Sequence, residues 1–574
     1  MKKNFFGKLF GLTLLMFTLL FTGASAETYE GTGLGYDKDG IVLDVEITNN
    51  KIVDVKVKRA KESEFATPAI QKIAKKVIAT QSLDVDGVSG ASLTSEGTKE
   101  AIEEAVKKSG VTLTAVTIAQ NTKAIELPKE ADVVVIGAGG AGLTSAIAAH
   151  EKGAKVILIE KTELLGGNTN YATAGLNAAG TKIQEKLGIK DSPELFYEDT
   201  MKGGKNKNNK ELVRVLVNNS SAIVDWLTKR GADLSELTST GGQSVKRTHR
   251  PTGGSAVGPN IVAALSKTAE SEKIDIRKGT KAIALVKAKN KIVGVKVREV
   301  DGKEYTIKAK AVIVATGGFG ANAKMVEKYN PKLKGFGSTN SPAIVGDGII
   351  MVEKVGGALV DMSEIQTHPT VVHNKTNMIT EAVRGEGAIL VNRDGKRFID
   401  ELETRDVVSK AILSQKGKSA FLIFDEDIRT KLKAADGYVK KGFAVEGTLE
   451  EIAAKIGTDA KTLEATLNKY NEAVKNKADS EFNKKNLPKE LTGTKYYAIE
   501  ISPAVHHTMG GVHINTNAEV LGKNGRPIKG LYAAGEVTGG IHGANRIGGN
   551  AVADITIFGK IAGENAAIYS KSVK

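Results

Sequence analysis

A glycine-rich turn that directly follows a run of β-branched residues restricts the fold of this chain more than any other segment. Residues 131–136 read as a buried parallel strand, and residues 137–142, Gly-Ala-Gly-Gly-Ala-Gly, open a helix. A second strand over residues 155–159 ends at Glu160, 18 residues past Gly142. In such an arrangement the helix N-terminus binds a pyrophosphate, and an acid at this place binds a ribose that has no 2′-phosphate. The sequence therefore predicts an α/β, Rossmann-like domain that binds a dinucleotide.

Further glycine turns indicate which dinucleotide is bound. They lie at residues 166–167, 174–181, 316–320 and 530–536, far apart in the chain. One extended dinucleotide that contacts several strand ends of a single sheet explains all of them, and we interpret it as FAD. At Thr316 a plain tight turn after the strand is also compatible with the sequence.

Residues 29–118 read as a separate, compact α+β unit. Apolar residues alternate over 41–47 and 52–57, on either side of an Asn-Asn turn, which is the pattern of a β-hairpin. Helices are predicted over 68–79 and 94–108, and glycines and small residues precede the second one. Such a turn presents backbone N–H groups that can accept a phosphate, although an ordinary helix N-cap loop would look the same.

The turn before this second helix carries a longer motif. Residues 86–92, Asp-Gly-Val-Ser-Gly-Ala-Ser, with Thr-Ser at 94–95, resemble the flavinylation motif of FMN-binding domains. The resemblance implies that a separate flavin transferase joins FMN by a phosphoester bond to the hydroxyl of Ser92, where the family more often has Thr. It also implies that Ser89, Gly90 and Ala91 belong to the FMN site.

The composition excludes several kinds of site. The 574 residues contain no cysteine, so this sequence has no disulfide, thiolate zinc site, cysteinyl iron–sulfur cluster or CxxCH haem attachment. We therefore predict no haem, and no motif indicates a metal site.

The first 26 residues read as a secretory signal peptide. Three lysines precede an apolar run over residues 9–21, and the small residues Ala-Ser-Ala end the segment at residue 26. The run is too short for a stable transmembrane helix, although an uncleaved N-terminal anchor is the alternative. We therefore expect an exported protein, either extracellular or associated with the cell envelope.

The basic charge of the chain points to anionic small molecules or surfaces. The formal charge of +15 falls to +12 without the signal peptide, which holds three lysines and no acid. The remaining lysines are scattered and aromatic residues make up only 5 % of the chain, so binding of a nucleic acid by stacking is not supported. A basic surface instead favours anionic substrates or an anionic envelope.

Five motifs in the second half of the chain resemble one family. Together with the glycine turns, they resemble the soluble fumarate reductases, the flavocytochrome c-like flavoproteins related to succinate dehydrogenase, over about residues 130–570. The motifs are Gln-Thr-His-Pro-Thr at 366–370, Thr-Glu-Ala-Val-Arg-Gly at 380–385, Thr-Arg-Asp at 404–406, His-His-Thr-Met-Gly-Gly at 506–511 and His-Gly-Ala-Asn-Arg-Ile-Gly-Gly-Asn at 542–550.

The resemblance implies an order of domains. In that family a mobile clamp domain closes over the substrate, so we expect a Rossmann-like FAD-binding domain with an inserted α+β clamp domain, preceded by the small α+β FMN-binding domain. Within the clamp, residues 450–476 are helix-patterned and residues 479–491 read as a polar surface loop. The predicted parts are the signal peptide 1–26, the FMN-binding domain 29–118, a linker 119–129, the first FAD-binding part 130–365, the clamp domain 366–501 and the second FAD-binding part 502–574.

The family also implies how FAD is held. Its membrane relatives carry a histidine bonded covalently to FAD in the segment that reads Tyr-Ala-Thr-Ala-Gly at residues 171–175 here, and this segment has no histidine. We therefore expect noncovalent FAD. The predicted contacts are Gly137, Gly139, Gly140, Ala141, Gly142, Glu160, Lys161, Gly166, Gly167, Asn168, Thr169, Ala174, Gly175, Gly317, Gly318, Asp347, His507, Gly535, Glu536, Asn550, Ala551 and Val552.

The family assigns catalytic roles to several charged residues. Arg405 is its proton donor, and Glu381 with Arg384 is the relay that reprotonates it. On their chemistry alone, Arg405 could instead pair with Asp406, and Glu381 with Arg384 could be a simple i,i+3 helix pair. A guanidinium fork matches a carboxylate, which suits Arg546 as a substrate clamp. The predicted substrate contacts are His368, Thr380, Glu381, His506, Arg546 and Gly549.

These expectations combine into one leading function. An exported fumarate reductase would take electrons from a quinol- or NADH-linked membrane donor at FMN, pass them to FAD and reduce fumarate, a small dicarboxylate, to succinate. The nearest alternative is another enoate as substrate, such as urocanate or an acrylate. An electron-transfer flavoprotein without an organic substrate is the alternative from another class, and it leaves Arg405, Arg546, His368 and His506 unexplained.

Overall fold

The structure is a computed structural model that describes residues 26–35, 40–62, 66–88, 90–116 and 128–573, with Ser92 and Lys433 described by their backbone alone. The predicted signal peptide, apart from its last residue, lies outside the described residues, as do Ser89 and most of the predicted linker. Within the described residues, no helix is both long and apolar enough to cross a membrane.

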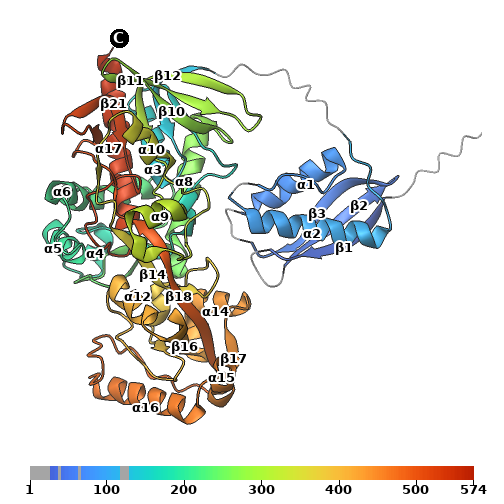
Figure 1. Cartoon of the computed structure of the whole chain (residues 1–574), viewed down its shortest axis with the longest axis vertical. Coiled ribbons are helices and arrows are strands. Elements are labelled where there is room, and N and C mark those ends of the chain that lie inside the picture. Colours follow the sequence, from blue (N-terminus) through green and yellow to red (C-terminus); the bar gives the residue numbers. More distant parts are fainter. Residues whose placement is uncertain (1–25, 36–39, 63–65, 89, 117–127, 574) are drawn as a thin grey trace, which may run out of the picture.

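The N-terminal unit is a three-stranded antiparallel sheet covered by two helices (Figure 1). Gly31 and Gly33 let the second helix approach the first strand, because a Cβ atom at these positions would lie 1.8 and 1.9 Å from backbone oxygens of that helix. The unit has a hydrophobic core of its own, and the predicted hairpin and both helices are present. The elements are β1 (Glu27–Gly33), β2 (Ile41–Thr48), β3 (Lys51–Ala60), α1 (Pro68–Thr80) and α2 (Ser92–Ser109).

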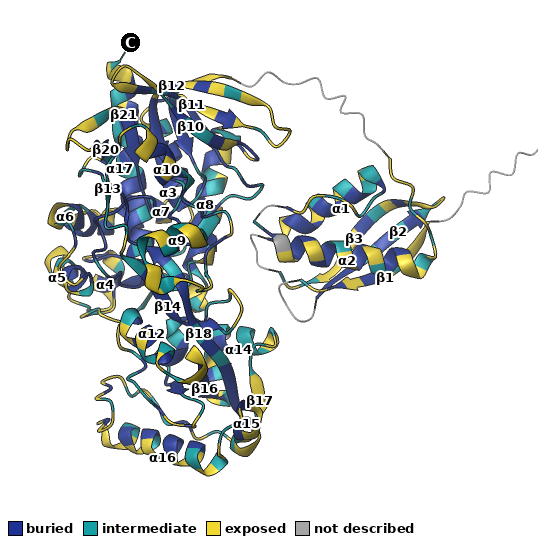
Figure 2. Ribbon diagram, viewed as in Figure 1, coloured by how far each residue is buried: buried dark blue, intermediate teal, exposed yellow. Residues whose placement is uncertain are grey.

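The second unit is built on an eight-stranded sheet with the order β10-β11-β21-β12-β4-β5-β9, in which β20 also pairs with β21. Its middle strands are parallel, and their last four residues are buried, which requires cover on both faces. Figure 2 shows this sheet buried beneath its helices, as the predicted dinucleotide fold requires. The strands are β4 (Glu130–Ile136), β5 (Val156–Ile159), β9 (Asp275–Arg277), β10 (Lys281–Ala288), β11 (Lys291–Arg298), β12 (Glu304–Val314), β20 (Glu519–Leu521) and β21 (Pro527–Ala533).

Helices and small sheets complete this unit. The helix after the glycine turn, α3 (Gly140–Glu151), packs against α8 (Val257–Ser271) and against the C-terminal helix α17 (Asn550–Ser572). A small sheet has the order β6-β8-β7, and β13 pairs with β19. The other elements are β6 (Leu176–Asn177), α4 (Lys182–Lys186), α5 (Pro193–Gly203), α6 (Lys210–Asn218), α7 (Ser220–Thr228), β7 (Glu236–Thr238), β8 (Thr248–Arg250), α9 (Ala323–Tyr329), α10 (Asp347–Lys354), β13 (Leu359–Val360) and β19 (Gly511–Val512).

The third unit is an α+β layer inserted between two parts of the second unit, with its own hydrophobic core. Its antiparallel sheet has the order β14-β18-β16-β15, and β17 pairs with β18. The long strand β18 runs from this sheet to the large pocket of the second unit (Figure 1). The elements are β14 (Ile365–Val372), α11 (Glu381–Gly385), β15 (Ile389–Val391), α12 (Arg405–Leu413), β16 (Ala420–Asp425), α13 (Glu426–Lys431), α14 (Lys433–Lys440), β17 (Val445–Gly447), α15 (Leu449–Ile456), α16 (Ala460–Asn476) and β18 (Tyr496–Thr508).

The segment 479–491 has neither helix nor strand, as predicted, but it is not simply a surface loop. Lys484 is 2 % exposed, and its Nζ lies 2.8 Å from the buried Glu401 carboxylate. Asp479 is also buried and lies 3.0 Å from Nη2 of Arg397. Charges can be buried when they are paired, and these partners are about 80 residues away in the sequence, so the loop's polar composition did not reveal its burial.

Candidate active site

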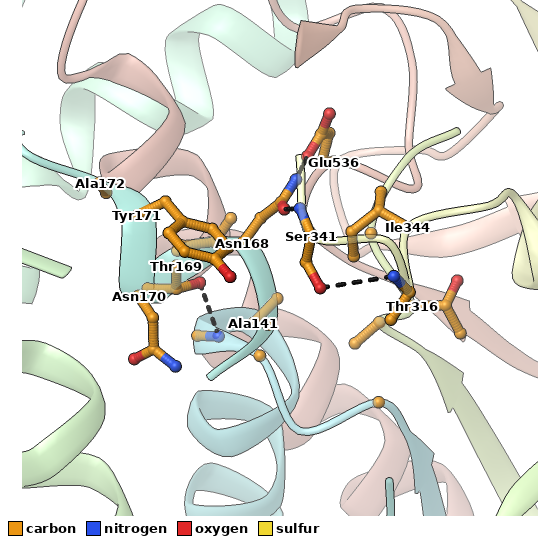
Figure 3. A pocket seen from close by; sticks show the side chains of 18 of the residues that line it. Ala141, Asn168, Thr169, Asn170, Tyr171, Ala172, Thr316, Ser341, Ile344 and Glu536 are labelled. Atoms are coloured by element: carbon orange, nitrogen blue, oxygen red, sulfur yellow. Dashed lines mark hydrogen bonds between the residues drawn. The ribbon is translucent and has the colours of Figure 1, made fainter. Parts of the chain in front are cut away.

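The glycine turn closes tightly at the end of β4. Gly137 has φ +98°, and a Cβ atom there would lie 2.6 Å from the Ala315 carbonyl oxygen. A Cβ atom on Gly142 would lie 1.7 Å from the Gly137 oxygen. The Gly140 N–H donates to Oγ1 of Thr169 at 3.0 Å (Figure 3). These contacts leave no room for side chains, so the start of α3 lies open to a ligand at backbone distance.

A large pocket lies at the carboxyl ends of β4, β5 and β12, where a doubly wound sheet binds its ligand. Five predicted FAD contacts do not line it and instead lie behind its wall: Gly142, Gly166, Gly318, Gly535 and Asn550. The structure places the following predicted contacts in its wall: Gly137, Gly139, Gly140, Ala141, Glu160, Lys161, Gly167, Asn168, Thr169, Ala174, Gly175, Gly317, Asp347, His507, Glu536, Ala551 and Val552.

The residues behind the wall have packing roles. A Cβ atom on Gly318 would lie 2.0 Å from Oγ1 of Thr508. Asn550 begins α17, and its Oδ1 accepts a hydrogen bond from Asn177 at 2.6 Å. Close packing accounts for the residue type at these two positions.

Two acids are held in fixed positions beside the pocket. Glu160 accepts hydrogen bonds from the N–H groups of Ala138 and Thr162, both at 2.8 Å, at the end of β5. Lys161 pairs with Asp347 at 2.6 Å, which joins two predicted contacts that are 186 residues apart. Contacts within the protein therefore fix the positions of Glu160, Lys161 and Asp347 near the end of β5.

A polar cluster holds the opposite wall of the pocket. Asn168 donates to Glu536 at 3.3 Å and accepts from the Ser341 N–H at 2.9 Å (Figure 3). Burial raises the pKa of Glu536, although the Thr508 N–H donates to its carboxylate at 3.1 Å. Burial thus disfavours the ionised form of this carboxyl, and the hydrogen bonds from Thr508 and Asn168 favour it.

The pocket has polar atoms that fit FAD. His507 and Thr316 belong to the pocket wall, and within the described residues both ring nitrogens of His507 and Oγ1 of Thr316 are buried without a hydrogen-bond partner. Buried polar groups are nearly always satisfied, so a polar ligand is expected to complete these bonds. A flavin dinucleotide also matches the closed glycine turn and the spread of the wall over several strand ends.

Arg405 begins α12 and points into the same pocket. Its Nε and Nη2 each lie 3.3 Å from Oε2 of Glu381. Asp406, the alternative partner, instead pairs with Lys205 and accepts from the Thr404 hydroxyl. The alternative of a local Arg405–Asp406 ion pair is therefore wrong.

Gln366 joins two guanidinium groups, a role that sequence reasoning missed. Its Oε1 accepts from Nη1 of Arg405 at 3.3 Å and from Nη2 of Arg546 at 3.1 Å. Its Nε2 donates to Oδ1 of Asn545 and to the Arg546 carbonyl, both at 2.8 Å. Gln366 and Asn545 lie inside two of the motifs, but no spacing rule connects residues 179 positions apart.

Two imidazoles lie beside these arginines. The rings of His368 on β14 and His506 on β18 meet edge to face with centroids 5.2 Å apart, and Nδ1 of His506 lies 2.8 Å from Oγ1 of Thr339. Burial, and next the charge of Arg405, holds the pKa of both imidazoles well below its usual range. Both are therefore neutral at pH 7.

Glu381 and Arg384 lie on the short helix α11, which begins after Thr380. Burial opposes ionisation of Glu381, but Arg405 and Arg384 outweigh it and hold its pKa below the usual value. Arg384 donates to the Glu401 carbonyl, and it forms no ion pair with Glu381, both residues being described. The i,i+3 helix pair is therefore absent. Burial lowers the pKa of Arg384.

The remaining predicted site residues lie at two different places. Gly549 lines the large pocket with φ +88°, and Thr380 is buried next to Glu381, where its N–H donates to the Tyr438 hydroxyl at 3.0 Å. In the N-terminal unit, Ser92 is the first residue of α2 and the buried Ala91 precedes it. Gly90 has φ +94°, which favours glycine, and Ser89 lies outside the described residues.

Comparisons with known proteins agree with this geometry. Residues 132–552 match the model of the FAD binding domain family, and residues 35–107 match that of the FMN-binding domain. The chain is 44 % identical over 535 residues to the NADH:fumarate oxidoreductase of Klebsiella pneumoniae, which covers 92 % of this chain but only 57 % of that relative's length. It is 52 % identical over 442 residues to the fumarate reductase (cytochrome) of Shewanella frigidimarina, with 77 % of each chain covered.

A full-length relative and a solved structure extend these matches. The urocanate reductase of Eggerthella lenta is 36 % identical over 567 residues, covering 95 % of this chain and 93 % of the relative. The open conformation of a flavocytochrome c3 fumarate reductase superposes with a TM-score of 0.69 at 43 % identity, covering 79 % of this chain and 80 % of that one. The chain therefore belongs to the FAD-binding oxidoreductase family of the soluble fumarate reductases, and it carries an FMN-binding domain before the FAD-binding domain.

Proposed function

We propose that this chain is an exported fumarate reductase that receives electrons at FMN on Ser92, passes them to noncovalent FAD and reduces fumarate to succinate. One observation carries the proposal. Arg405 and Arg546 share the single oxygen of Gln366 at the pocket wall, and the ionised Glu381 is the only carboxylate hydrogen-bonded to either of them among the described residues. The excess positive charge suits a dianionic substrate.

The pocket residues can divide the reaction between them. FAD, when bound, supplies a hydride to one alkene carbon. Arg546 binds one carboxylate through its guanidinium fork, while the neutral His368 and His506, with Thr380, donate hydrogen bonds to the carboxylates. Arg405 delivers a proton to the second alkene carbon. Fumarate thus gains one hydride and one proton and leaves as succinate, with the same charge of −2.

Reprotonation of Arg405 uses the contact with Glu381. The two residues are 3.3 Å apart, within reach of direct proton transfer after a small approach. Behind them, burial lowers the pKa of Arg384, which makes this guanidinium a better acid than one in water. Within the described residues Arg384 and Glu381 form no ion pair, so a proton from Arg384 has to reach Glu381 through a water or a movement of the side chains before Glu381 passes it to Arg405.

Replacement of Arg405 tests the proposal. In Arg405→Ala, fumarate reduction driven by reduced methyl viologen should fall at least about 100-fold, because the general acid is lost, while FAD content stays near one per chain. Arg429→Ala on the clamp surface is the matched control, since Arg429 pairs only with Glu426 and Asp436 among the described acids. Activity of Arg405→Ala close to that of the control would contradict the assignment.

Another enoate is the second candidate, favoured by the full-length match to a urocanate reductase. Every enoate needs Arg405 as the proton donor and Arg546 for one carboxylate, but only fumarate adds a second negative charge that the excess positive charge of the pocket can balance. Under anaerobic conditions, kcat/KM should therefore be highest for fumarate in a panel that includes urocanate and acrylate. A higher value for either of the latter would transfer the proposal to that substrate. A carrier without a substrate would reduce none of them.

Maturation and export are separate parts of the proposal. Their support is the flavinylation motif and the signal-peptide pattern of the sequence, and they require a flavin transferase and an upstream membrane electron donor in the host. Intact mass spectrometry of protein from its native host should show one FMN on the wild type and none on Ser92→Ala. The mature protein should begin at Glu27 in the exported fraction; a chain that begins at Met1 and stays in the cytoplasm would refute export.

A further inference from the structure

A contact between the N-terminal unit and the FAD-binding unit lies away from the arginine cluster. Lys72 on α1 donates from Nζ to the Glu163 side chain at 2.9 Å and to the Glu163 carbonyl at 3.0 Å. Glu163 lies in the loop after β5, and both side chains are about one third exposed. Because one ammonium group binds two acceptors of the same residue, it fixes the orientation of this loop against α1.

The next residue, Leu164, adds an apolar contact. It packs against the hydrophobic core of the N-terminal unit. Its Cβ and Cδ1 lie 3.8 Å from the place of a Cβ atom on Gly90, the glycine of the turn before α2. A charged contact and an apolar contact therefore stand side by side in two consecutive residues.

The loop that makes both contacts is an extension of the FAD site. Glu160 accepts from the N–H and the hydroxyl of Thr162, at 2.8 and 2.9 Å, and that hydroxyl also lies 2.7 Å from the Leu164 carbonyl. The acid at the end of β5 thus holds the loop that meets the N-terminal unit. A loop supported in this way keeps its shape without the partner and presents a preformed surface.

Gly90 also opens onto the cofactor pocket. It lines the large pocket together with Lys161, Thr162 and Leu164. A second cavity is bounded by Gly90 on one side and by Lys161, Thr162, Lys281 and residues 341–343 on the other. The turn that precedes the flavin acceptor therefore lies at the mouth of the FAD pocket.

We propose that residues 162–165 form the docking surface for the FMN-bearing turn of the N-terminal domain, with the Lys72–Glu163 pair fixing its orientation and Leu164 filling the apolar contact. The proposal rests on the proposed function, since it names the place where electrons cross between the domains. The step oxidises FMNH2 to FMN and reduces FAD to FADH2, so electrons and protons balance. Small contacts of this kind are typical of electron-transfer encounters, and a tether in the same chain raises the local concentration enough for a small surface to suffice.

Zero-length cross-linking tests the surface without depending on flavin chemistry. A carbodiimide applied to the full-length holoprotein should join Lys72 to Glu163, identified by peptide mass spectrometry. The link should be absent in Lys72→Glu and in Glu163→Lys, and it should return in the double variant, where the charges are exchanged. Absence of the wild-type link, with other ion pairs of the N-terminal unit linked, would overturn the proposal.

Electron transfer between the domains gives the second readout. After two electrons from a photochemical donor have reduced FMN to FMNH2, FAD reduction should be about tenfold slower in either single variant and recover to within about twofold in the double variant. Leu164→Asp should be slow as well. The matched control exchanges Lys58 and Glu30, which form an ion pair within the N-terminal sheet. In this variant electrons should pass from FMN to FAD at the wild-type rate.

Viologen-driven fumarate reduction separates this proposal from the proposed function. Methyl viologen can reduce FAD directly, so this activity should be unchanged in Lys72→Glu, in Glu163→Lys and in their double variant, since neither residue lines the pocket. Suppose that neither the wild type nor any variant reduces fumarate, but that FAD reduction is slow in both single variants and recovers in the double variant. The docking surface then stands and the substrate assignment fails. If fumarate is reduced normally and both single variants transfer electrons at the wild-type rate, the docking surface is wrong.

Discussion

Gln366 accounts for how two arginines can lie close together in one buried pocket. Guanidinium groups repel each other, and burial with the charge of Arg405 lowers the pKa of Arg546 to about 9. The neutral oxygen of Gln366 accepts a hydrogen bond from each guanidinium group. It therefore lowers the free-energy cost of burying the two groups together without neutralising the positive charge that an anionic substrate needs. An acid in its place would hold the same geometry but compete with the substrate.

Substitution of Gln366 should therefore separate geometry from charge. Gln366→Leu removes two hydrogen bonds to charged groups, so kcat/KM for fumarate should fall about 10- to 100-fold. Gln366→Glu keeps an acceptor but should raise KM, because its carboxylate neutralises the pocket. Steady-state kinetics with FAD content measured for each variant provide the check. Equal KM values for the wild type and Gln366→Glu would contradict the charge argument.

His249 couples stability to pH. It is fully buried on β8, and its Nδ1 donates to the Arg247 carbonyl at 2.9 Å. Burial lowers the pKa of His249 from 6.5 to about 4. The unfolded chain therefore binds this proton first as the pH falls, so the neutral imidazole's contribution to stability is complete above pH 6.5 and is lost progressively toward pH 4.

Urea unfolding at two pH values should reveal this contribution. Between pH 7 and pH 5, His249 alone should lower the free energy of unfolding by about 2 kcal/mol. In His249→Asn the loss over the same interval should be smaller by this amount, even though the variant is less stable at pH 7. Other buried histidines contribute equally to both proteins, so the difference isolates His249. If the free energy of unfolding falls by the same amount in the wild type and in His249→Asn, the pKa of His249 is not lowered.

The glycine turn shows how a short element can determine cofactor binding. At Gly142 the α3 backbone and the Gly137 carbonyl are too close for any side chain. Gly142→Ala should therefore displace the turn, and FAD binding should weaken by at least about fivefold, as overpacking in a rigid site costs about 1 kcal/mol or more. FAD titration by fluorescence quenching measures the effect.

The control for this substitution lies in another helix. A Cβ atom on Gly437 in α14 would have no described atom within 4 Å other than its own helix backbone, and this glycine has no left-handed φ. Gly437→Ala should leave FAD binding unchanged and stabilise the clamp by about 0.5–1 kcal/mol, because alanine favours the helix. Equal FAD affinity of Gly142→Ala and Gly437→Ala would refute the steric argument.

The described residues form three large hydrophobic cores and a small fourth cluster around Phe196. The N-terminal domain, the FAD-binding domain and the inserted α+β unit each have their own buried cluster, and Leu164 is the partly buried residue of the FAD-binding unit that packs on the N-terminal core. Arg405 comes from the inserted unit and Arg546 from the C-terminal part of the FAD-binding unit. The arginine pair of the pocket therefore depends on two of the three large cores.

Removal of residues 1–127 tests this independence. The remaining chain should fold, bind FAD and reduce fumarate with viologen at a kcat within about twofold of the full chain, because no core residue of the FAD-binding unit is lost. It should no longer accept electrons through FMN. Calorimetry should show one unfolding transition fewer than in the full chain. Loss of FAD binding would mean that the N-terminal domain is part of the FAD site.

Local patterns in the sequence determined the elements and their ligand-binding ends. A strand, a glycine turn and a helix are specified by neighbouring residues, so β4, the turn and α3 were predictable, as were the hairpin and helices of the N-terminal domain. The five motifs indicated the family because their residues are close in sequence. Only the tertiary structure decided which of these residues meet.

The physical reason is that contacts between distant segments depend on packing, not on spacing. Gln366 between Arg405 and Arg546, Asp406 turned toward Lys205, and Lys484 buried on Glu401 all arise where separate elements are brought together. In the same way, the loop after β5 reads as part of a dinucleotide site, and only the fold places Leu164 against Gly90. The sequence by itself determined the fold class and the cofactor pocket, and the tertiary structure decided how its charges are paired and where the two flavin-binding domains touch.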